Sequence, residues 1–371
     1  MSNKFAPVLD AFGINPEACV VKPMGSGHVH DTYFIHHCED GYPPLVLQKI
    51  NHYIFRDVEL LMHNLEIVTS HISDKNRKLG KNPACYGIVF LETDEGKSWT
   101  GNPTDGYWRL YWYIEDQVVF DVVPDSDVAF EGGAAIGSFQ GMLTDLDASL
   151  ISDSIPGFHD LQFRIGQFRE AMEHGDNERI EYSSSLAEKI MHHQVDMLHV
   201  YERSRLNNLP VRITHNDAKF NNILFHNSKS ADNPGFKANC LIDLDTVMKG
   251  YAWFDFGDAL RTAGSTASED EKRLRAIDFR LDIFEGFTKG YFQKGRDFLT
   301  NDEVELMHRA PAVFAYNQSM RFLTDYMTND KYYKTNSKDH NYHRAMAQFR
   351  LMEKILEKQQ VMKKIVDSTV E

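Results

Sequence analysis

The feature that most constrains the fold of this chain is a change of hydrophobic pattern about one third of the way along it. Up to that point, short runs of β-branched and aromatic residues alternate with turn residues, as the strands of a small sheet do. A helical spacing of apolar residues between Phe55 and Ile72 predicts one helix in this part. The predicted strands cover residues 19–24, 31–37, 45–50, 85–90 and 107–114.

From about Val128 onward, long helical patterns replace the short runs, and one β-rich stretch lies within them. The predicted helices cover residues 128–149, 180–203, 268–291, 301–326 and 341–366, and the β-rich stretch covers 211–217, 222–227 and 238–245. At 371 residues, the chain is longer than one typical core. We therefore predict an α+β protein with two lobes: an N-terminal lobe with a small antiparallel sheet (1–115) and a larger, mainly helical C-terminal lobe (116–371).

Charge and hydropathy exclude several classes of partner. The formal net charge of −14 argues against nucleic acid, which requires a basic face. No stretch approaches the roughly 18 apolar residues that span a bilayer. The N-terminus shows no secretory pattern, and the four cysteines show no paired spacing. We expect a cytoplasmic protein that binds no membrane, and nothing in the sequence implies a protein partner.

The segment THNDAKFNNILF at 214–225 carries the most chemical information. It places Asp217 two residues after His215 and Asn222 five residues after Asp217, and further on Asp243 ends an apolar strand. Phosphoryl transfer needs a carboxylate beside the attacking hydroxyl and oxygen ligands for Mg²⁺, and amide and carboxylate oxygens suit that cation. Each residue taken singly could simply form a turn. The combination favours phosphoryl transfer.

These residues resemble the aminoglycoside phosphotransferase and choline kinase family, relatives of protein kinases that phosphorylate small alcohols. The resemblance implies a protein-kinase-like fold and the use of ATP and Mg²⁺. It implies Asp217 as catalytic base, Asn222 and Asp243 as metal ligands, and His215 and Asp255 as structural supports of the catalytic loop. Asp245 could reach a second metal or hydrogen-bond to a loop.

The same resemblance predicts where the first lobe holds ATP. Gly25, Ser26 and Gly27 would cover the phosphates, since glycine lets backbone N–H groups approach an anion closely. Lys49 would contact the phosphates, with an acidic partner from the 55–72 helix, either Glu59 or Glu66. The segment from Arg109 to Glu115 would be the hinge, where backbone groups hold adenine.

Three stretches, at 27–33, at 215–225 followed by 242–248, and at 321–326, are similar to bacterial N-acetylhexosamine 1-kinases, with departures at His30 and Lys249. This likeness implies a free hexosamine as acceptor, phosphorylated by ATP at its anomeric hydroxyl, but not which epimer. Asp217, His28, Arg321 and Asp325 would then contact the sugar, although spacing alone would make the last two a surface ion pair.

Three rival functions stay open. The acceptor could be another small alcohol, such as an aminoglycoside, choline, homoserine or methylthioribose. The chain could be a catalytically silent kinase-like module, although Asp217, Asn222 and Asp243 are all present. The histidines at 192–193 and at 340 and 343 suggest a metal-dependent hydrolase. No carboxylate stands at ligand spacing from them, so solvated histidines on helix surfaces are the better interpretation.

Overall fold

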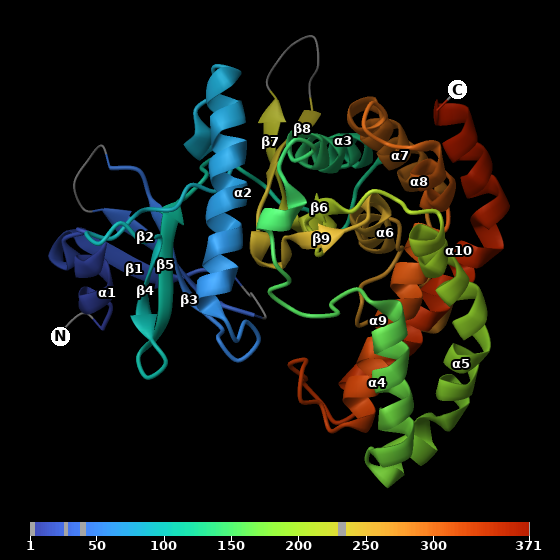
Figure 1. Ribbon diagram of the computed structural model, residues 1–371. Helices are drawn as coiled ribbons and strands as arrows, with labels where there is room; N and C mark the ends of the chain where they lie inside the picture. The colour runs from blue at the N-terminus through green and yellow to red at the C-terminus, as the bar shows by residue number, and fades with distance from the viewer. Residues whose placement is uncertain (1–3, 26–28, 38–41, 229–234, 371) are drawn as a thin grey trace. The chain divides into compact units, whose positions relative to one another are not determined.

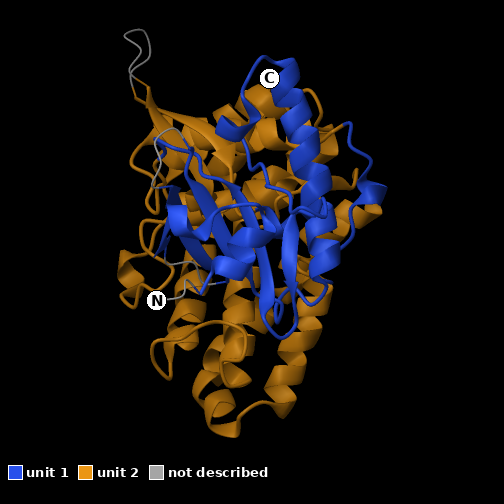
Figure 2. Ribbon diagram, turned by 90° about the vertical axis from the view of Figure 1, so that its left-hand side faces the viewer, with its two compact units in different colours: residues 1–117, 145–156, 244–248 blue, residues 118–144, 157–243, 249–371 orange. Residues whose placement is uncertain are grey.

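The computed structural model describes residues 4–25, 29–37, 42–228 and 235–370, and it divides the chain into two compact units (Figures 1 and 2). We predicted a single boundary near residue 115. In the structure the chain passes from one unit to the other five times, after Gln117, Thr144, Pro156, Asp243 and Met248. The first unit therefore contains two short later segments, Asp145–Pro156 and Leu244–Met248, besides residues 1–117.

The first unit is built on a five-stranded antiparallel sheet in the order β1-β2-β3-β5-β4. Its elements are α1 (Ala6–Ala11), β1 (Cys19–Pro23), β2 (Asp31–His37), β3 (Leu45–Ile50), α2 (Val58–Lys78), β4 (Trp99–Asn102) and β5 (Gly106–Trp112). Leu9 of α1 packs against Ile35, Leu47 and Leu110 on one face of the sheet. Helix α2 begins where the Asp57 side chain accepts a hydrogen bond from the Leu60 N–H, an N-cap that supplies one partner the helix start lacks.

One predicted strand of this unit is wrong. Residues 83–85 form a 3-10 helix, and of the segment 85–90 only Phe90 makes a β-bridge, to Tyr111. The edge beside β5 is taken instead by β4, because a tight turn closes β4 and β5 locally. In that turn the Asn102 side chain accepts hydrogen bonds from the N–H groups of Thr104 and Asp105.

The second unit is mainly helical and contains two small two-stranded sheets, β6–β9 and β7–β8. Its elements are α3 (Ser126–Met142), α4 (Leu161–His174), α5 (Asn177–Leu206), β6 (Arg212–Thr214), β7 (Ile223–Ser228), β8 (Gly235–Leu241), β9 (Met248–Gly250, which contains the last crossing between units), α6 (Ala252–Ala263), α7 (Leu281–Gly295), α8 (Asn301–Met307), α9 (Ala310–Met327) and α10 (His340–Val370).

Three helix predictions in this unit need correction, and two helices were missed. Helix α3 ends at Met142, before the predicted end at 149. Helix α7 begins only at Leu281, because Phe279 is drawn into a β-bridge with Ser265. The helical pattern at 301–326 forms two helices, α8 and α9. Pro311 lies in the first turn of α9 and has no N–H group to bond to the preceding turn, so a single continuous helix is disfavoured. Helices α4 and α6 were not predicted. Nearly every side chain of α6 is buried, including the polar side chains of Asp255, Asp258 and Arg261, which lie along one face of the helix.

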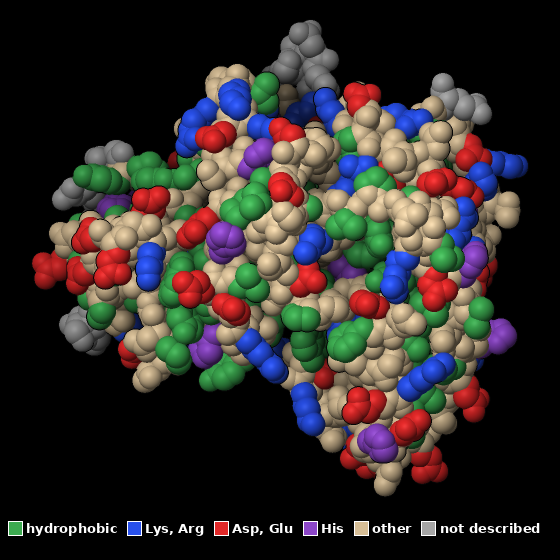
Figure 3. All heavy atoms as spheres, in the orientation of Figure 1, with side chains coloured by type: hydrophobic (Ala, Val, Ile, Leu, Met, Phe, Trp, Pro, Cys, Tyr) green, Lys and Arg blue, Asp and Glu red, His purple; other side chains and the backbone are tan. Residues whose placement is uncertain are grey.

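Helix α9 forms the centre of the second unit, with Tyr316, Met320, Leu323 and Tyr326 fully buried. Helices α3 and α7 cross closely because glycines face the opposite backbone: a Cβ at Gly133 would lie 2.1 Å from the Phe287 carbonyl oxygen. On the face drawn in Figure 3, acidic and basic side chains are interspersed without a continuous basic field, consistent with the net charge of −14. Among the described helices, none combines the length and apolar composition that crossing a bilayer requires.

Candidate active site

The loop at 214–222, between β6 and β7 of the second unit, holds the predicted catalytic residues. Asn216 has a left-handed backbone (φ 63°), a conformation that asparagine tolerates better than most residues. Its side chain accepts a hydrogen bond from the Thr214 hydroxyl at 3.0 Å. Gly250 packs so closely that a Cβ there would lie 2.3 Å from the Thr214 hydroxyl oxygen, so only glycine fits.

Asp255, in the first turn of α6, anchors this loop. Its carboxylate accepts hydrogen bonds from the backbone N–H groups of His215 (2.9 Å) and Asn216 (2.8 Å) and from the Gln140 side chain (2.8 Å). Asp255 is 0% exposed, and this burial raises its pKa despite the three donors. The carboxylate therefore stabilises the backbone and is unavailable to a substrate.

His215 links the loop to the end of β8. One ring nitrogen, Nε2, lies 2.9 Å from the Ile242 carbonyl oxygen, and Nδ1 lies 3.3 Å from the Asp217 backbone nitrogen. A carbonyl can only accept and a backbone N–H can only donate, so the proton is assigned to Nε2. The ring is thereby held between the two backbone segments that carry Asp217 and Asp243.

Asp217 itself is partly exposed and ionised. Its carboxylate lies 3.1 Å from the Lys219 ammonium, and 26% of the Asp217 side chain remains accessible. Burial would raise the pKa of Asp217, but the Lys219 charge, followed by His215, outweighs it and holds the pKa below its ordinary value. A carboxylate of this kind accepts a proton at neutral pH. Sequence reasoning missed Lys219; a lysine two residues after the aspartate of the motif was the available signal.

Hydrogen bonds join Asn222 to the backbone of Asp217 and to that of Ile242, the residue before Asp243. The Asn222 amide nitrogen donates to the Asp217 carbonyl oxygen at 2.8 Å, which turns the amide oxygen away from that contact. The Asn222 backbone carbonyl accepts a hydrogen bond from the Ile242 N–H at 2.9 Å, and Asp243 is the residue after Ile242. Asp243 is exposed and has a left-handed backbone (φ 61°).

The pair Asn222 and Asp243 fits magnesium. Both present oxygen, which this hard cation prefers, and Mg²⁺ is commonly bound through one or two carboxylates plus substrate phosphates. Within the described part of the chain, no group of three or more His, Cys, Asp or Glu side chains is arranged to hold a metal.

In the first unit, Lys49 lies on β3 with its ammonium 5.4 Å from the Trp108 ring centroid. Across the described residues it forms no ion pair with either predicted glutamate. The Glu66 carboxylate accepts a hydrogen bond from Ser98, and Glu59 is exposed in the first turn of α2. Gly25 has a left-handed backbone (φ 72°), and the predicted Ser26, Gly27 and His28 lie outside the described residues. The Glu115 carbonyl accepts from the Gln117 side chain.

Arg109, the first residue of the predicted hinge segment, is buried on strand β5. Its guanidinium donates to both carboxylate oxygens of Asp245, at 2.6 and 2.7 Å, and both side chains are 4% exposed. His30 approaches the same carboxylate at 3.5 Å and accepts a hydrogen bond from the Asn51 N–H. Burial would raise the pKa of Asp245, but Arg109 outweighs it and lowers the pKa. Of the two roles left open for Asp245, hydrogen bonding within the protein is the one observed, and His30 lies in this network.

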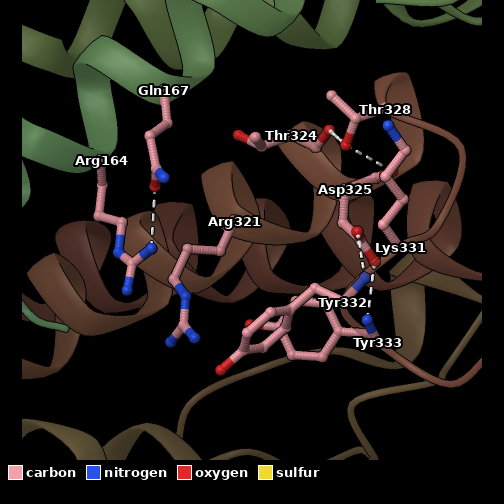
Figure 4. A pocket seen from close by; sticks show the side chains of 9 residues that line it. All are labelled: Arg164, Gln167, Arg321, Thr324, Asp325, Thr328, Lys331, Tyr332 and Tyr333. Carbon is pink, nitrogen blue, oxygen red and sulfur yellow. Dashed lines mark hydrogen bonds between the residues drawn. The ribbon is translucent and has the colours of Figure 1, made fainter. Parts of the chain in front are cut away.

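A pocket of about 200 Å³ opens within the second unit, and Figure 4 shows its walls. Its lining residues come from α4, α9 and the segment 331–333: Arg164, Gln167, Arg321, Thr324, Asp325, Thr328, Lys331, Tyr332 and Tyr333. Arg321, a predicted substrate contact, faces this pocket.

Asp325, the other predicted substrate contact on α9, is hydrogen-bonded within the protein. The Asp325 carboxylate accepts hydrogen bonds from the N–H groups of Tyr332 (2.8 Å) and Tyr333 (2.9 Å) and from the Asn341 amide (2.9 Å). Arg321 and Asp325 therefore do not form the ion pair that their spacing suggested.

The antiparallel sheet, the helical second unit and the 214–222 loop together define a kinase-like phosphotransferase fold. Residues 20–288 match the model of the phosphotransferase enzyme family described as APH. Because the match covers more than half of the chain, the chain belongs to this family.

Solved structures show the same fold at low identity. An ethanolamine kinase from Plasmodium vivax superposes with a TM-score of 0.59 at 11% identity, over 93% of this chain and 87% of the other. An aminoglycoside phosphotransferase from Alicyclobacillus acidocaldarius gives 0.56 at 11% identity, over 95% and 93%. A choline kinase from Cryptosporidium parvum gives 0.53 at 12% identity, over 96% and 94%.

Proposed function

We propose that this protein transfers the γ-phosphoryl group of ATP to a hydroxyl group of a small molecule, with Asp217 as the base. The observation that carries the proposal is a hydrogen-bonded frame: His215 and Asn222 each join the backbone of Asp217 to that of Ile242, the residue before Asp243. The hydroxyl proton passes to the Asp217 carboxylate, the acceptor oxygen bonds to phosphorus, and the bond to the leaving ADP oxygen breaks. Magnesium on Asn222 and Asp243 would neutralise phosphate charge.

For the nucleotide, we propose contacts from the first unit. Lys49 would pair with the phosphates, and Gly25, Ser26 and Gly27 would cover them through backbone N–H groups. The backbone near Glu115 would hold adenine. Lys49 is free of any carboxylate partner among the described residues, so its charge is available to an anion.

For the acceptor, we propose a free N-acetylhexosamine, phosphorylated at its anomeric hydroxyl to the sugar 1-phosphate. The three similar stretches support a sugar, and so does a pocket that combines tyrosine rings with the hydrogen-bonding groups of Gln167, Arg321 and Thr324. An anomeric hydroxyl is more acidic than an ordinary alcohol, so a base with a lowered pKa suffices. The relatives act on ethanolamine, choline or aminoglycosides by name, and these cations would meet the guanidinium groups of Arg164 and Arg321 here.

The test measures ADP release with Mg-ATP and a panel of acceptors: N-acetylglucosamine, N-acetylgalactosamine, choline, ethanolamine, homoserine, methylthioribose and an aminoglycoside. We expect turnover with a hexosamine, and ³¹P NMR should place the phosphorus on the anomeric oxygen. Turnover with a cationic alcohol alone would refute the sugar assignment. No turnover with any acceptor, despite nucleotide binding, would favour the silent module.

The matched control is Asp217→Asn, which keeps the shape of the side chain but cannot accept the proton. We expect a loss of about 10²- to 10⁴-fold in kcat with ATP binding retained. Near-normal turnover of this variant would show that Asp217 is not the base.

A further inference from the structure

Two arginines line the pocket of the second unit, and neither has a carboxylate partner in the described part of the chain. Arg164 donates from Nε and Nη2 to the Phe158 carbonyl oxygen (3.2 and 3.0 Å) and from Nη1 to the Gln167 amide oxygen (2.9 Å). Arg321 makes one long hydrogen bond, to the Gln318 amide oxygen at 3.4 Å. The buried Arg109 of the first unit, in contrast, is paired with the Asp245 carboxylate.

The acidic residue of the pocket does not neutralise them. The Asp325 carboxylate is turned toward the backbone of Tyr332 and Tyr333, as the dashed lines of Figure 4 show, and is shared with Asn341. Lys331 adds a third positive charge to the lining. The pocket therefore has an excess of positive charge, although the whole chain has a net charge of −14.

Holding the two guanidinium groups together is unfavourable in the absence of an anion. Burial, followed by the charge of Arg321, lowers the pKa of Arg164 to about 10. The Arg321 guanidinium is fixed by aromatic rings, with its central carbon 5.0 Å from the ring centroid of Phe158, 5.8 Å from that of Tyr332 and 5.7 Å from that of Tyr333. A preorganised guanidinium with open donors matches the planar or tetrahedral oxygens of an oxyanion.

The pocket lies close to the catalytic loop of the same unit. The His159 ring donates from Nε2 to the Asn216 carbonyl oxygen at 2.6 Å, one residue before Asp217. Burial lowers the pKa of His159 to about 3, so the ring is neutral, and Arg321 and Arg164 both contribute to this lowering. Burial would lower the pKa of Arg321. The electrostatic influence of Tyr333 and Tyr332, followed by that of Asp217, is larger and raises this pKa.

We infer that Arg164 and Arg321 bind an oxyanion of the acceptor, a carboxylate or a phosphate carried on the same molecule as the hydroxyl that reaches Asp217. This inference rests on the proposed function and makes it more specific: the preferred acceptor is a hexosamine or related sugar with an acidic substituent away from its reacting hydroxyl. The same geometry disfavours acceptors that carry ammonium groups.

The test compares two pairs of acceptors that differ by an anion: N-acetylglucosamine 6-phosphate with N-acetylglucosamine, and glucuronate with glucose. We expect the KM of at least one anionic member to be about 10- to 100-fold lower, the range that hydrogen bonds to a charged group provide. Arg164→Gln and Arg321→Gln should remove this advantage. Arg169→Gln, an exposed arginine on the same helix α4, is the matched control and should preserve it.

Isothermal titration of the same four compounds without nucleotide separates this inference from the proposed function. Arginine-dependent binding of an anionic member with no turnover of any compound would support the anion site and refute the hexosamine kinase. Turnover of the neutral sugars with no preference for the anionic ones, or a preference that both Gln variants retain, would refute the anion site alone. Neither binding nor turnover would refute both.

Discussion

The 214–222 loop and the pocket lined by Arg164 and Arg321 lie in the same unit, and both bring charged side chains out of water. At the loop, these charges have partners: Asp217 pairs with Lys219, and Asp255 of α6 accepts hydrogen bonds from two backbone N–H groups of the loop. In the pocket, Arg164 and Arg321 face neutral oxygens and aromatic rings.

This difference indicates what each region is built for. A fully buried and fully paired charge such as Asp255 is part of the fold, since its removal leaves buried partners unsatisfied. A pair of like charges without a counterion reduces stability, and proteins retain such arrangements at sites where a ligand supplies the missing charge. The comparison predicts opposite effects on stability when a charge is removed from each region.

The largest effect is expected at Asp255. Asp255→Ala leaves the backbone N–H groups of His215 and Asn216 without their acceptor in a buried position. Each unsatisfied group costs about 1–3 kcal/mol, so we expect a loss of about 2–6 kcal/mol in the free energy of unfolding. Urea unfolding followed by circular dichroism measures this.

Asp255→Asn is the matched control, because its amide oxygen can still accept one of the two hydrogen bonds. It should lose less than the alanine variant. If both variants unfolded within about 0.5 kcal/mol of the native protein, as ordinary surface substitutions do, Asp255 would not anchor the loop.

The loop was predictable from the sequence and the pocket was not, for a physical reason. Asp217, Asn222 and Asp243 stand at fixed offsets in a short segment and at the end of a strand, so local geometry brings them together. The pocket joins α4, which was not predicted, to α9 and the 331–333 segment more than 150 residues later, and only tertiary packing sets the distance between Arg164 and Arg321. Arg321 was proposed from a resemblance, and Arg164 was not proposed at all.

The same reasoning explains the errors in the fold. The five-stranded sheet and most helices follow from hydrophobic periodicity, but the apolar run at 85–90 predicts a strand that does not form. The observed strand β4 has only four residues, two of them exposed, and its position depends on the turn at Asn102. The role of Asp245 could not be predicted either, because its partner, Arg109, is 136 residues away in the sequence.

An intermediate effect is expected at Lys219, as a change of pH dependence. The Lys219 charge lowers the pKa of Asp217 against the opposing influence of burial. In Lys219→Met burial is opposed only by the smaller contributions of His215 and Arg261. The acid limb of kcat should therefore move to higher pH, because Asp217 must be ionised to accept a proton. The ion pair also stabilises the fold above the unfolded-state pKa of Asp217, and this contribution is lost as pH falls through the lowered folded-state value.

Lys219→Arg keeps the positive charge and is the control for this profile. Its acid limb should stay near that of the native protein. An unchanged limb in Lys219→Met would show that the ammonium group does not govern the ionisation of Asp217, and the paired character assigned to the loop would then be wrong.

The smallest effect is expected at Arg164, and here the sign matters more than the size. Arg164→Gln removes a charge that burial and Arg321 disfavour, while the amide can still donate toward the Phe158 carbonyl. We expect the free energy of unfolding at pH 7 to be unchanged or to rise by up to about 1 kcal/mol. Residues that are kept for function often reduce stability, so replacing them can stabilise the protein. The pKa of Arg164 in the folded state is lowered to about 10. The destabilisation caused by its buried charge is therefore complete at pH 7 and decreases only when the pH rises above about 10.

Arg179 gives the comparison its contrast, since it also lies in the second unit but has a counterion. Its guanidinium contacts the Asp330 carboxylate at 2.5 Å and donates to the Tyr326 carbonyl at 2.8 Å, and its side chain is 12% exposed. Arg179→Gln should therefore lower stability, by about 1–3 kcal/mol for the hydrogen bonds left unmade. If Arg164→Gln were as destabilising as Arg179→Gln in the absence of ligand, Arg164 would be a structural arginine, and the distinction between a paired loop and an unpaired pocket would not hold.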